Sequence, residues 1–117
     1  MRALTSLTAA ALLAAPAAMA EQVASETEFM NIVQGKTLSR APQIDLQVKP
    51  NGEIIGKGLQ WPVTGSWSWN DGYFCRNMDW GGMEIGYNCQ MVTMDSSNRI
   101  RFTSDRGAGR SAAFRLN

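Results

Sequence analysis

The sequence has no histidine and only two cysteines, Cys75 and Cys89. Catalytic pairs of serine or cysteine with histidine, and metal sites built on histidine, are therefore excluded. Two cysteines cannot complete a tetrahedral zinc site by themselves. We expect neither a metal ion nor a catalytic residue of these classes.

An excess of charge of one sign is also missing, because 11 basic residues are balanced by 10 acidic ones. Nothing in this composition favours a nucleic-acid partner, which requires a basic surface. The short GAG stretch at 107–109 lacks the G-x-G-x-x-G spacing that holds a dinucleotide, and no βαβ pattern surrounds it. We therefore predict no cofactor.

Long apolar runs are confined to the N-terminal segment. Arg2 precedes a short apolar stretch, and Ala18-Met19-Ala20 has the A-x-A form of a signal-peptidase site. The stretch is too short to cross a bilayer, and no second one follows. The sequence predicts a signal peptide over 1–20, one domain over 21–117, and a periplasmic or secreted monomer without a transmembrane segment. In such an oxidising compartment we expect Cys75 and Cys89 to form a disulfide.

The rest of the sequence is dominated by a β pattern. Only the segment 25–33 predicts a helix, because Ser25 and Glu28 have capping-box spacing and Phe29, Ile32 and Val33 recur at helical intervals. Alternating runs between turn residues predict eight antiparallel strands, near 37–40, 43–49, 53–59, 63–69, 73–79, 84–94, 99–104 and 111–116. We predict a mainly β protein, a small up-and-down barrel or curled meander with the helix over one end. Its interior is either filled by side chains or holds one small ligand.

Turn residues predict how the strands pair. A three-residue turn at 50–52 places Lys49 opposite Glu53 and Asp45 opposite Lys57, with glycines on the other face that leave room for bulky side chains such as tryptophans. A hairpin through 80–84 is centred on Gly82, which lies seven residues from each cysteine, so it places the two cysteines opposite each other.

The segment WSWNDGYFCR, 67–76, admits two turns. A three-residue turn at 70–72 pairs Trp69 with Tyr73 and Trp67 with Cys75, whereas a two-residue Asp-Gly turn puts both tryptophans on the face opposite the cysteines. We favour the three-residue turn because it separates apolar from polar residues on both faces, except at Phe74. The inner face predicted in this way consists of Trp67, Trp69, Tyr73, Cys75, Tyr87, Cys89 and Met91.

The C-terminal hairpin completes the predicted pairing. A turn at 95–98 places Met91 and Thr93 opposite Phe102 and Ile100, and Phe102 then meets Phe114 across the last loop.

This hairpin is also the first candidate site, because it is rich in arginine. On the predicted register Arg101 and Arg115 lie opposite each other on the outer face, which is unfavourable unless an anion or an acidic partner lies between them. Backbone N–H groups of the RGAGR loop could add donors to an anion. The alternative is a solvated basic hairpin, or a register that is shifted by one residue. The candidate anion- or partner-binding residues are Arg99, Arg101, Arg106, Arg110, Arg115, Gly107 and Gly109.

Aromatic residues form two further candidate groups. Trp67, Trp69, Tyr73 and Phe102 are predicted to be core or to line a ligand, with an exposed stacking platform for a sugar or base as the alternative. Trp80 and Met83, at the tip of a hairpin, are a candidate exposed contact.

A set of carboxylates near hairpin tips is the remaining candidate for chemistry. Asp71, Asp79 and Glu84 could hydrolyse a glycoside if two of them converged in one cleft, but their spacing equally fits solvated turn residues.

Several motifs resemble a group of small exported proteins of Gram-negative bacteria. They are FMNIVQGKTL, VTGSWSWNDGYFCR, YNCQ and RFTSDRGAGRSAAF, which together span most of the chain after the leader. Some proteins of this group carry the name dihydrodipicolinate reductase. That activity needs a dinucleotide-binding fold and a second domain, and this sequence has neither. The architecture is also similar to lipocalin-type and lysozyme-inhibitor-type barrels, a likeness of design only.

The predicted function is that of a non-enzymatic periplasmic binding or interaction module, which recognises an acidic protein partner or an anionic small molecule through its basic hairpin. A lipocalin-like carrier of a small apolar ligand, lined by Trp67, Trp69 and Phe102, is the first alternative. A carboxylate-dependent hydrolase is the second.

Overall fold

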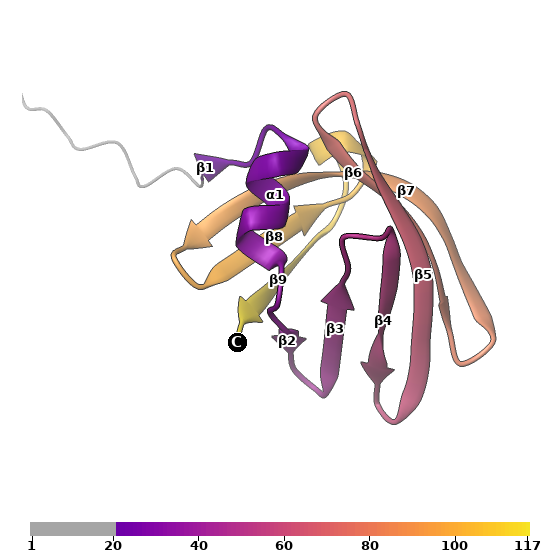
Figure 1. The fold of residues 1–117 in the computed structure, drawn as a ribbon. Coiled ribbons are helices and arrows are strands. Elements are labelled where there is room, and N and C mark those ends of the chain that lie inside the picture. The colour runs from indigo at the N-terminus through magenta and orange to yellow at the C-terminus, as the bar shows by residue number, and fades with distance from the viewer. Residues whose placement is uncertain (1–20) are drawn as a thin grey trace, which may run out of the picture.

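Eight consecutive antiparallel strands close into a barrel in the computed structural model, which describes residues 21–117 (Figure 1). The strands are β2 (Leu38–Arg40), β3 (Ile44–Val48), β4 (Glu53–Gly58), β5 (Trp61–Asn70), β6 (Tyr73–Trp80), β7 (Met83–Ser96), β8 (Arg99–Thr103) and β9 (Ser111–Leu116). Closure occurs between the first and last of them, where Leu38 pairs with Leu116. A ninth strand, β1 (Glu21–Gln22), pairs with the end of β7. The predicted barrel is therefore confirmed. The predicted leader lies outside the described residues.

The helix α1 (Glu26–Val33) covers one end of the barrel, as the sequence predicts. Ser25 accepts a hydrogen bond from the Glu28 N–H at 3.2 Å, and the Glu28 carboxylate accepts one from the Ala24 N–H at 3.1 Å. The first bond satisfies an N–H group that the first turn of a helix leaves free, and the second holds the residue before the N-cap. Phe29 and Val33 are fully buried, so the apolar face of the helix forms part of the core.

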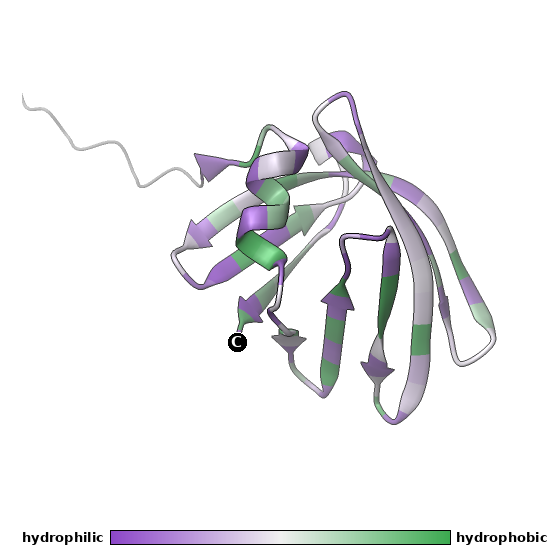
Figure 2. Cartoon of the chain, viewed as in Figure 1, coloured by the Kyte–Doolittle hydropathy of each residue, from purple (hydrophilic) through white to green (hydrophobic). Residues whose placement is uncertain are grey.

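The pairing of β3 with β4 agrees with the prediction. Asp45 lies opposite Lys57, and Gly52 has the positive φ that the turn requires. The space above Gly58 is occupied by Trp80, whose indole donates a hydrogen bond of 2.8 Å to the Gly58 carbonyl. A tryptophan does fill the room left by a glycine here, but it is Trp80 and not Trp67 or Trp69. The alternation of apolar and polar residues along β3 is visible in Figure 2.

The turn between β5 and β6 differs from the predicted one. Asp71 and Gly72 both have positive φ, 53° and 87°, and they form a two-residue turn in which Trp69 pairs with Phe74 and Ser68 with Cys75. Such turns are favoured because their twist matches that of the strands they join. The predicted inner face is therefore confirmed for Trp67 and Trp69 and wrong for Tyr73, Cys75, Tyr87, Cys89 and Met91. Trp67 and Phe74 are buried in the barrel, while Tyr73 and the cysteines lie on the opposite face of the sheet.

The predicted disulfide is confirmed, with Cys75 paired directly to Cys89 across β6 and β7. The hairpin that aligns them is not the simple one expected. A two-residue turn at 81–82 is followed by a bulge, so that Met78 pairs with Gly86 while Trp80 pairs with Met83. The extra residue of the bulge restores the register that a longer turn would have produced.

The pairing of β7 with β8 is shifted by one residue from the prediction. Val92 pairs with Phe102 and Met94 with Ile100, instead of Met91 and Thr93. Val92 and Ile100 are fully buried, so the shift places the more apolar residues of β7 in the core.

Candidate functional site

A cavity of about 230 Å³ lies inside the barrel, below the side chains that α1 covers. Every barrel strand except β5 contributes to its lining. Most of the wall is aliphatic or aromatic. The apolar lining residues are Leu38, Leu46, Val48, Ile54, Phe74, Met78, Phe102, Ala112 and Phe114.

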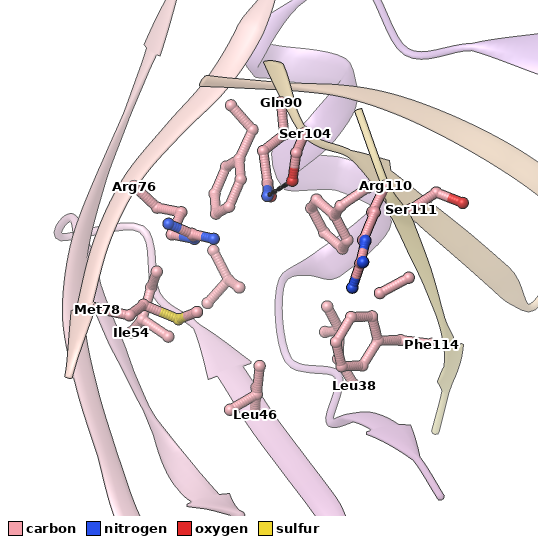
Figure 3. A pocket seen from close by; sticks show the side chains of 14 residues that line it. Leu38, Leu46, Ile54, Arg76, Met78, Gln90, Ser104, Arg110, Ser111 and Phe114 are labelled. Carbon is pink, nitrogen blue, oxygen red and sulfur yellow. Dashed lines mark hydrogen bonds between the residues drawn. The ribbon is translucent and has the colours of Figure 1, made fainter. Parts of the chain in front are cut away.

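Polar side chains gather at one end of this cavity (Figure 3). Arg76 projects from β6 and Arg110 from the loop residue just before β9, on opposite walls. Between them, the amide of buried Gln90 donates a hydrogen bond of 3.3 Å to the Ser104 hydroxyl. The cavity is thus amphipathic, with a cationic end and an apolar end.

Arg76 is half-buried and has no acidic partner. Its Nη1 donates a hydrogen bond of 2.9 Å to the carbonyl of Gly86, the residue that follows the bulge in β7. Burial away from water lowers the pKa of Arg76, although a guanidinium stays protonated at any physiological pH. Between residues 21 and 117 the ion pairs involve only Arg99, Arg101 and Asp95, so no acidic side chain of this range neutralises the charge of Arg76.

A second hollow, of about 300 Å³, lies next to the cavity at the end of the barrel away from α1. Leu46, Met78 and Phe114 line both spaces, so these three side chains separate them. Large apolar side chains are exposed around this end, namely Leu59, Trp61, Met83 and Ile85. Trp80 itself is half-buried by its contact with Gly58, so of the predicted exposed pair only Met83 projects freely.

Of the four aromatic residues predicted to be core or ligand-lining, only Phe102 reaches the cavity. Trp67 and Trp69 pack on the ring of Phe29, at centroid distances of 5.5 and 5.2 Å, and fill the end under α1. Tyr73 lies outside, where the guanidinium of Arg106 stacks 5.2 Å from its ring centroid. The tryptophans are therefore core residues rather than an exposed platform.

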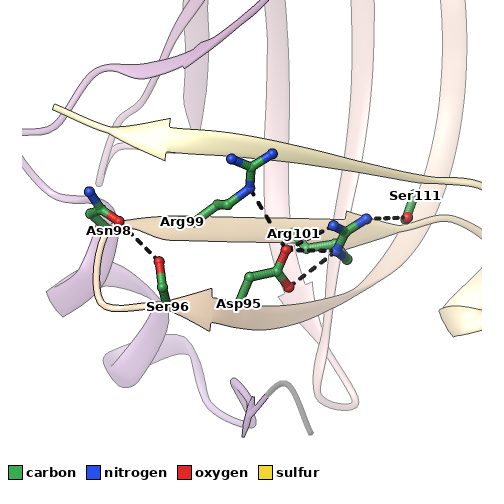
Figure 4. Close-up of polar contacts among 6 residues, drawn as sticks. All are labelled: Asp95, Ser96, Asn98, Arg99, Arg101 and Ser111. Atoms are coloured by element: carbon green, nitrogen blue, oxygen red, sulfur yellow. Dashed lines mark hydrogen bonds and ion pairs between the residues drawn. The ribbon is translucent and has the colours of Figure 1, made fainter. Parts of the chain in front are cut away.

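The basic hairpin has a different register from the one predicted. Arg99, not Arg101, lies opposite Arg115, and Arg101 lies opposite Ala113. Arg101 forms a two-point contact with Asp95, at 3.0 Å from Nε and 2.8 Å from Nη2, and its Nη1 donates to Ser111 (Figure 4). These contacts lower the pKa of Asp95, chiefly through the hydrogen bond from Arg101, and raise the pKa of Arg101. Arg101 is therefore already paired.

The glycine N–H groups of the RGAGR loop are not free to bind an anion. The N–H groups of Gly107 and Gly109 both donate to the Ser104 carbonyl, at 3.1 and 2.9 Å. Arg99 and Arg115 instead line an outer hollow together with Arg40 and Asp45. Recognition of an acidic protein partner by this outer face stays a prediction.

The carboxylates do not form the predicted cluster. Asp79 and Glu84 pair across the β6–β7 hairpin, but Asp71 lies in the turn before the other end of β6, roughly 25 Å away along the strand. Asp79 accepts a hydrogen bond of 2.8 Å from the Gly82 N–H, as a turn residue does.

Within residues 21–117, no three acidic or cysteine side chains lie close enough together to hold a metal ion. Nor is any helix in this part of the chain long and apolar enough to cross a bilayer.

Arg76, Gln90 and Ser104 are site residues that the sequence reasoning missed. The signal was Phe74, which the favoured turn left on a polar face. With the two-residue turn, Phe74, Arg76 and Met78 all point inward, and an arginine between two apolar residues on an inner face would have indicated the polar end of the cavity.

Comparison of the chain with protein-family models, curated proteins and solved structures gives no match. The resemblance to small exported proteins therefore stays a prediction, and the function has to be argued from the geometry of the barrel.

Proposed function

We propose that the protein is a binding protein that holds one small, largely apolar molecule inside its barrel. The observation that supports this proposal is the cavity of about 230 Å³, which has a mainly apolar wall although the opposite end of the same barrel is tightly filled. The cavity is open to water at exposed Arg110, but its apolar wall belongs to the inside of the barrel, where side chains normally pack against one another. Pockets for drug-sized ligands are usually larger, about 300–1,000 Å³, so a short-chain molecule fits best.

The route into the cavity supports the same proposal. The hollow of about 300 Å³ at the open end is bounded by exposed apolar side chains and is separated from the cavity by three residues only. Met78 is one of them, and an unbranched thioether side chain changes rotamer at little cost. A ligand can therefore enter without unfolding a strand.

We propose further that the protein works in an oxidising compartment, the periplasm or outside the cell. The disulfide between Cys75 and Cys89 supports this location, because disulfides persist mainly there. N-terminal sequencing of the exported protein checks the proposal, which requires a start near Glu21.

The test of ligand binding is to fill the cavity from one of two adjacent alanines. Ala112 lines the cavity, whereas Ala113 lies on the other face of β9, in the outer hollow. We expect Ala112→Leu to weaken binding of 1-octanol at least tenfold and Ala113→Leu to leave it unchanged. Titration followed by the methyl NMR signals of Leu46 and Ile54 measures both affinity and position. Absence of saturable binding, or equal loss in the two variants, would contradict the proposal.

A further inference from the structure

We propose that the ligand is an amphiphile with a carboxylate or similar anionic head, held between Arg76 and Arg110 at the polar end of the cavity. This inference rests on the proposed function, since it assumes that the cavity is occupied, and it adds the chemical class of the occupant. The lining includes two guanidinium groups and no acidic residue. An anion is the group that this arrangement can bind and that the protein itself does not supply.

Arg76 carries the argument because its charge is costly where it lies. The side chain is half-buried against apolar residues, and its acceptor in the described part of the chain is one carbonyl oxygen, that of Gly86. A guanidinium has further N–H donors in the same plane, and these fit a carboxylate in a two-point contact. A charge removed from water without a partner is unfavourable, so an anion that enters the cavity recovers part of this cost.

Arg110 supplies the second donor group from the opposite wall. Its backbone carbonyl accepts a hydrogen bond of 2.8 Å from the Ser104 N–H, which anchors the residue just before β9 begins. The side chain is exposed and extends into the cavity (Figure 3). No acid lies within ion-pair distance of it in residues 21–117. An exposed arginine on a fixed backbone can adjust to the head group as it arrives.

The remaining wall selects an amphiphile over a small inorganic anion. Leu46 and Phe114 line both the cavity and the open hollow, so an apolar wall continues from the arginines toward the open end. A free phosphate or acetate would leave this apolar surface uncovered, whereas an alkyl chain attached to the head would cover it. The head would therefore lie between the arginines and the chain would point to the open end.

The experiment compares octanoate with 1-octanol, which share a chain length and differ in the head group. Dissociation constants are measured by calorimetry at neutral pH for the wild type, Arg76→Met, Arg110→Met and the control Arg99→Met. Arg99 lies on the outer face, so the control removes the same charge without touching the cavity. Hydrogen bonds to a charged group correspond to about 10- to 100-fold in affinity. We expect each cavity variant to reduce the octanoate-to-octanol preference by about this factor, with octanol binding and the Arg99→Met preference unchanged.

Three outcomes would overturn the inference. If octanol binds but the preference is the same in all four proteins, the cavity takes a neutral ligand and the proposed function stands alone. If neither molecule binds, both proposals are wrong. If acetate binds as tightly as octanoate, the chain contributes nothing and the ligand is not an amphiphile. Should Arg76→Met fail to fold because the Gly86 carbonyl loses its donor, Arg110→Met decides the question, since that residue is exposed.

Discussion

Individual arginines of the C-terminal hairpin differ in what they can bind, although the sequence presents them as one basic group. Arg101 is held by Asp95, Arg106 stacks on Tyr73, and Arg110 enters the barrel. Arg99 reaches Asp95 only at 3.9 Å and lies opposite Arg115. Charge alone therefore does not identify an anion site, and the immediate neighbour of each guanidinium decides its role.

The contact between Asp95 and Arg101 should make a small contribution to stability that depends on pH. We expect Asp95→Asn to lower the free energy of unfolding by about 0.5–1 kcal/mol at neutral pH. Two nitrogens of Arg101 donate to Asp95, which strengthens the pair, but the pair is largely exposed, which limits its contribution. The folded-state pKa of Asp95 lies below its ordinary value of 3.8. The contribution is thus complete above pH 3.8 and is lost as the pH falls through the folded-state pKa.

Urea unfolding from pH 7 to pH 2 measures this dependence, and the two curves should converge in acid. A double-mutant cycle with Arg101→Met isolates the pair, because the second substitution should cost little once the first is present. A difference between wild type and Asp95→Asn that persists at pH 2 would assign the effect to something other than the ion pair.

At the scale of the element, the hairpins show which strand registers can be predicted from the sequence. The β3–β4 hairpin was predicted correctly because two opposite-charge pairs and a glycine turn all require one register. In the β5–β6 hairpin, two turn lengths fitted the local residues, and the wrong choice moved every side chain of one strand to the other face.

Bulges were the other limit on prediction. The cysteine pairing was predicted correctly although the hairpin itself differs, because the bulge after Met78 offsets the shorter turn. A further irregularity between Met94 and Ser96 shifted β7 against β8. Gly86, with φ 96°, is the one sequence signal at the first irregularity, and no glycine lies near the second. The fold was therefore predictable, whereas the polar end of the cavity was not.

The two-residue turn itself gives a sharp prediction. Asp71 adopts φ 53°, a conformation that asparagine tolerates and alanine does not, whereas in a three-residue turn only Gly72 would require positive φ. We expect Asp71→Ala to lower the free energy of unfolding by about 1 kcal/mol and Asp71→Asn to leave it unchanged or slightly raised. The urea midpoints of the two variants test this prediction. Equal stability of the alanine and asparagine variants would contradict the two-residue turn.

At the scale of the whole molecule, the barrel has a filled half and a hollow half. The filled half contains the rings of Phe29, Trp67 and Trp69, which pack together under α1, and Phe74 lies between this half and the cavity. The hollow half lies toward the short seam between β2 and β9. This division lets one end maintain the fold while the other binds, which is the usual compromise between stability and function.

The seam should be the place where the barrel opens most easily. Two residue pairs join β2 to β9, against seven pairs and a disulfide between β6 and β7. Local opening follows the least stabilised contacts, so amide hydrogens of β2 and β9 should exchange faster than those of β6.

Leu38 on β2 and Ala112 on β9 also line the cavity, so a bound ligand should hold the seam between these strands closed. With free octanoate at about 100 times its dissociation constant, exchange at the seam should slow about 100-fold. Hydrogen exchange followed by NMR measures this effect, with the Ala112→Leu protein as control. Equal protection of the seam and β6 in the free protein would show that the barrel does not open between its first and last strands.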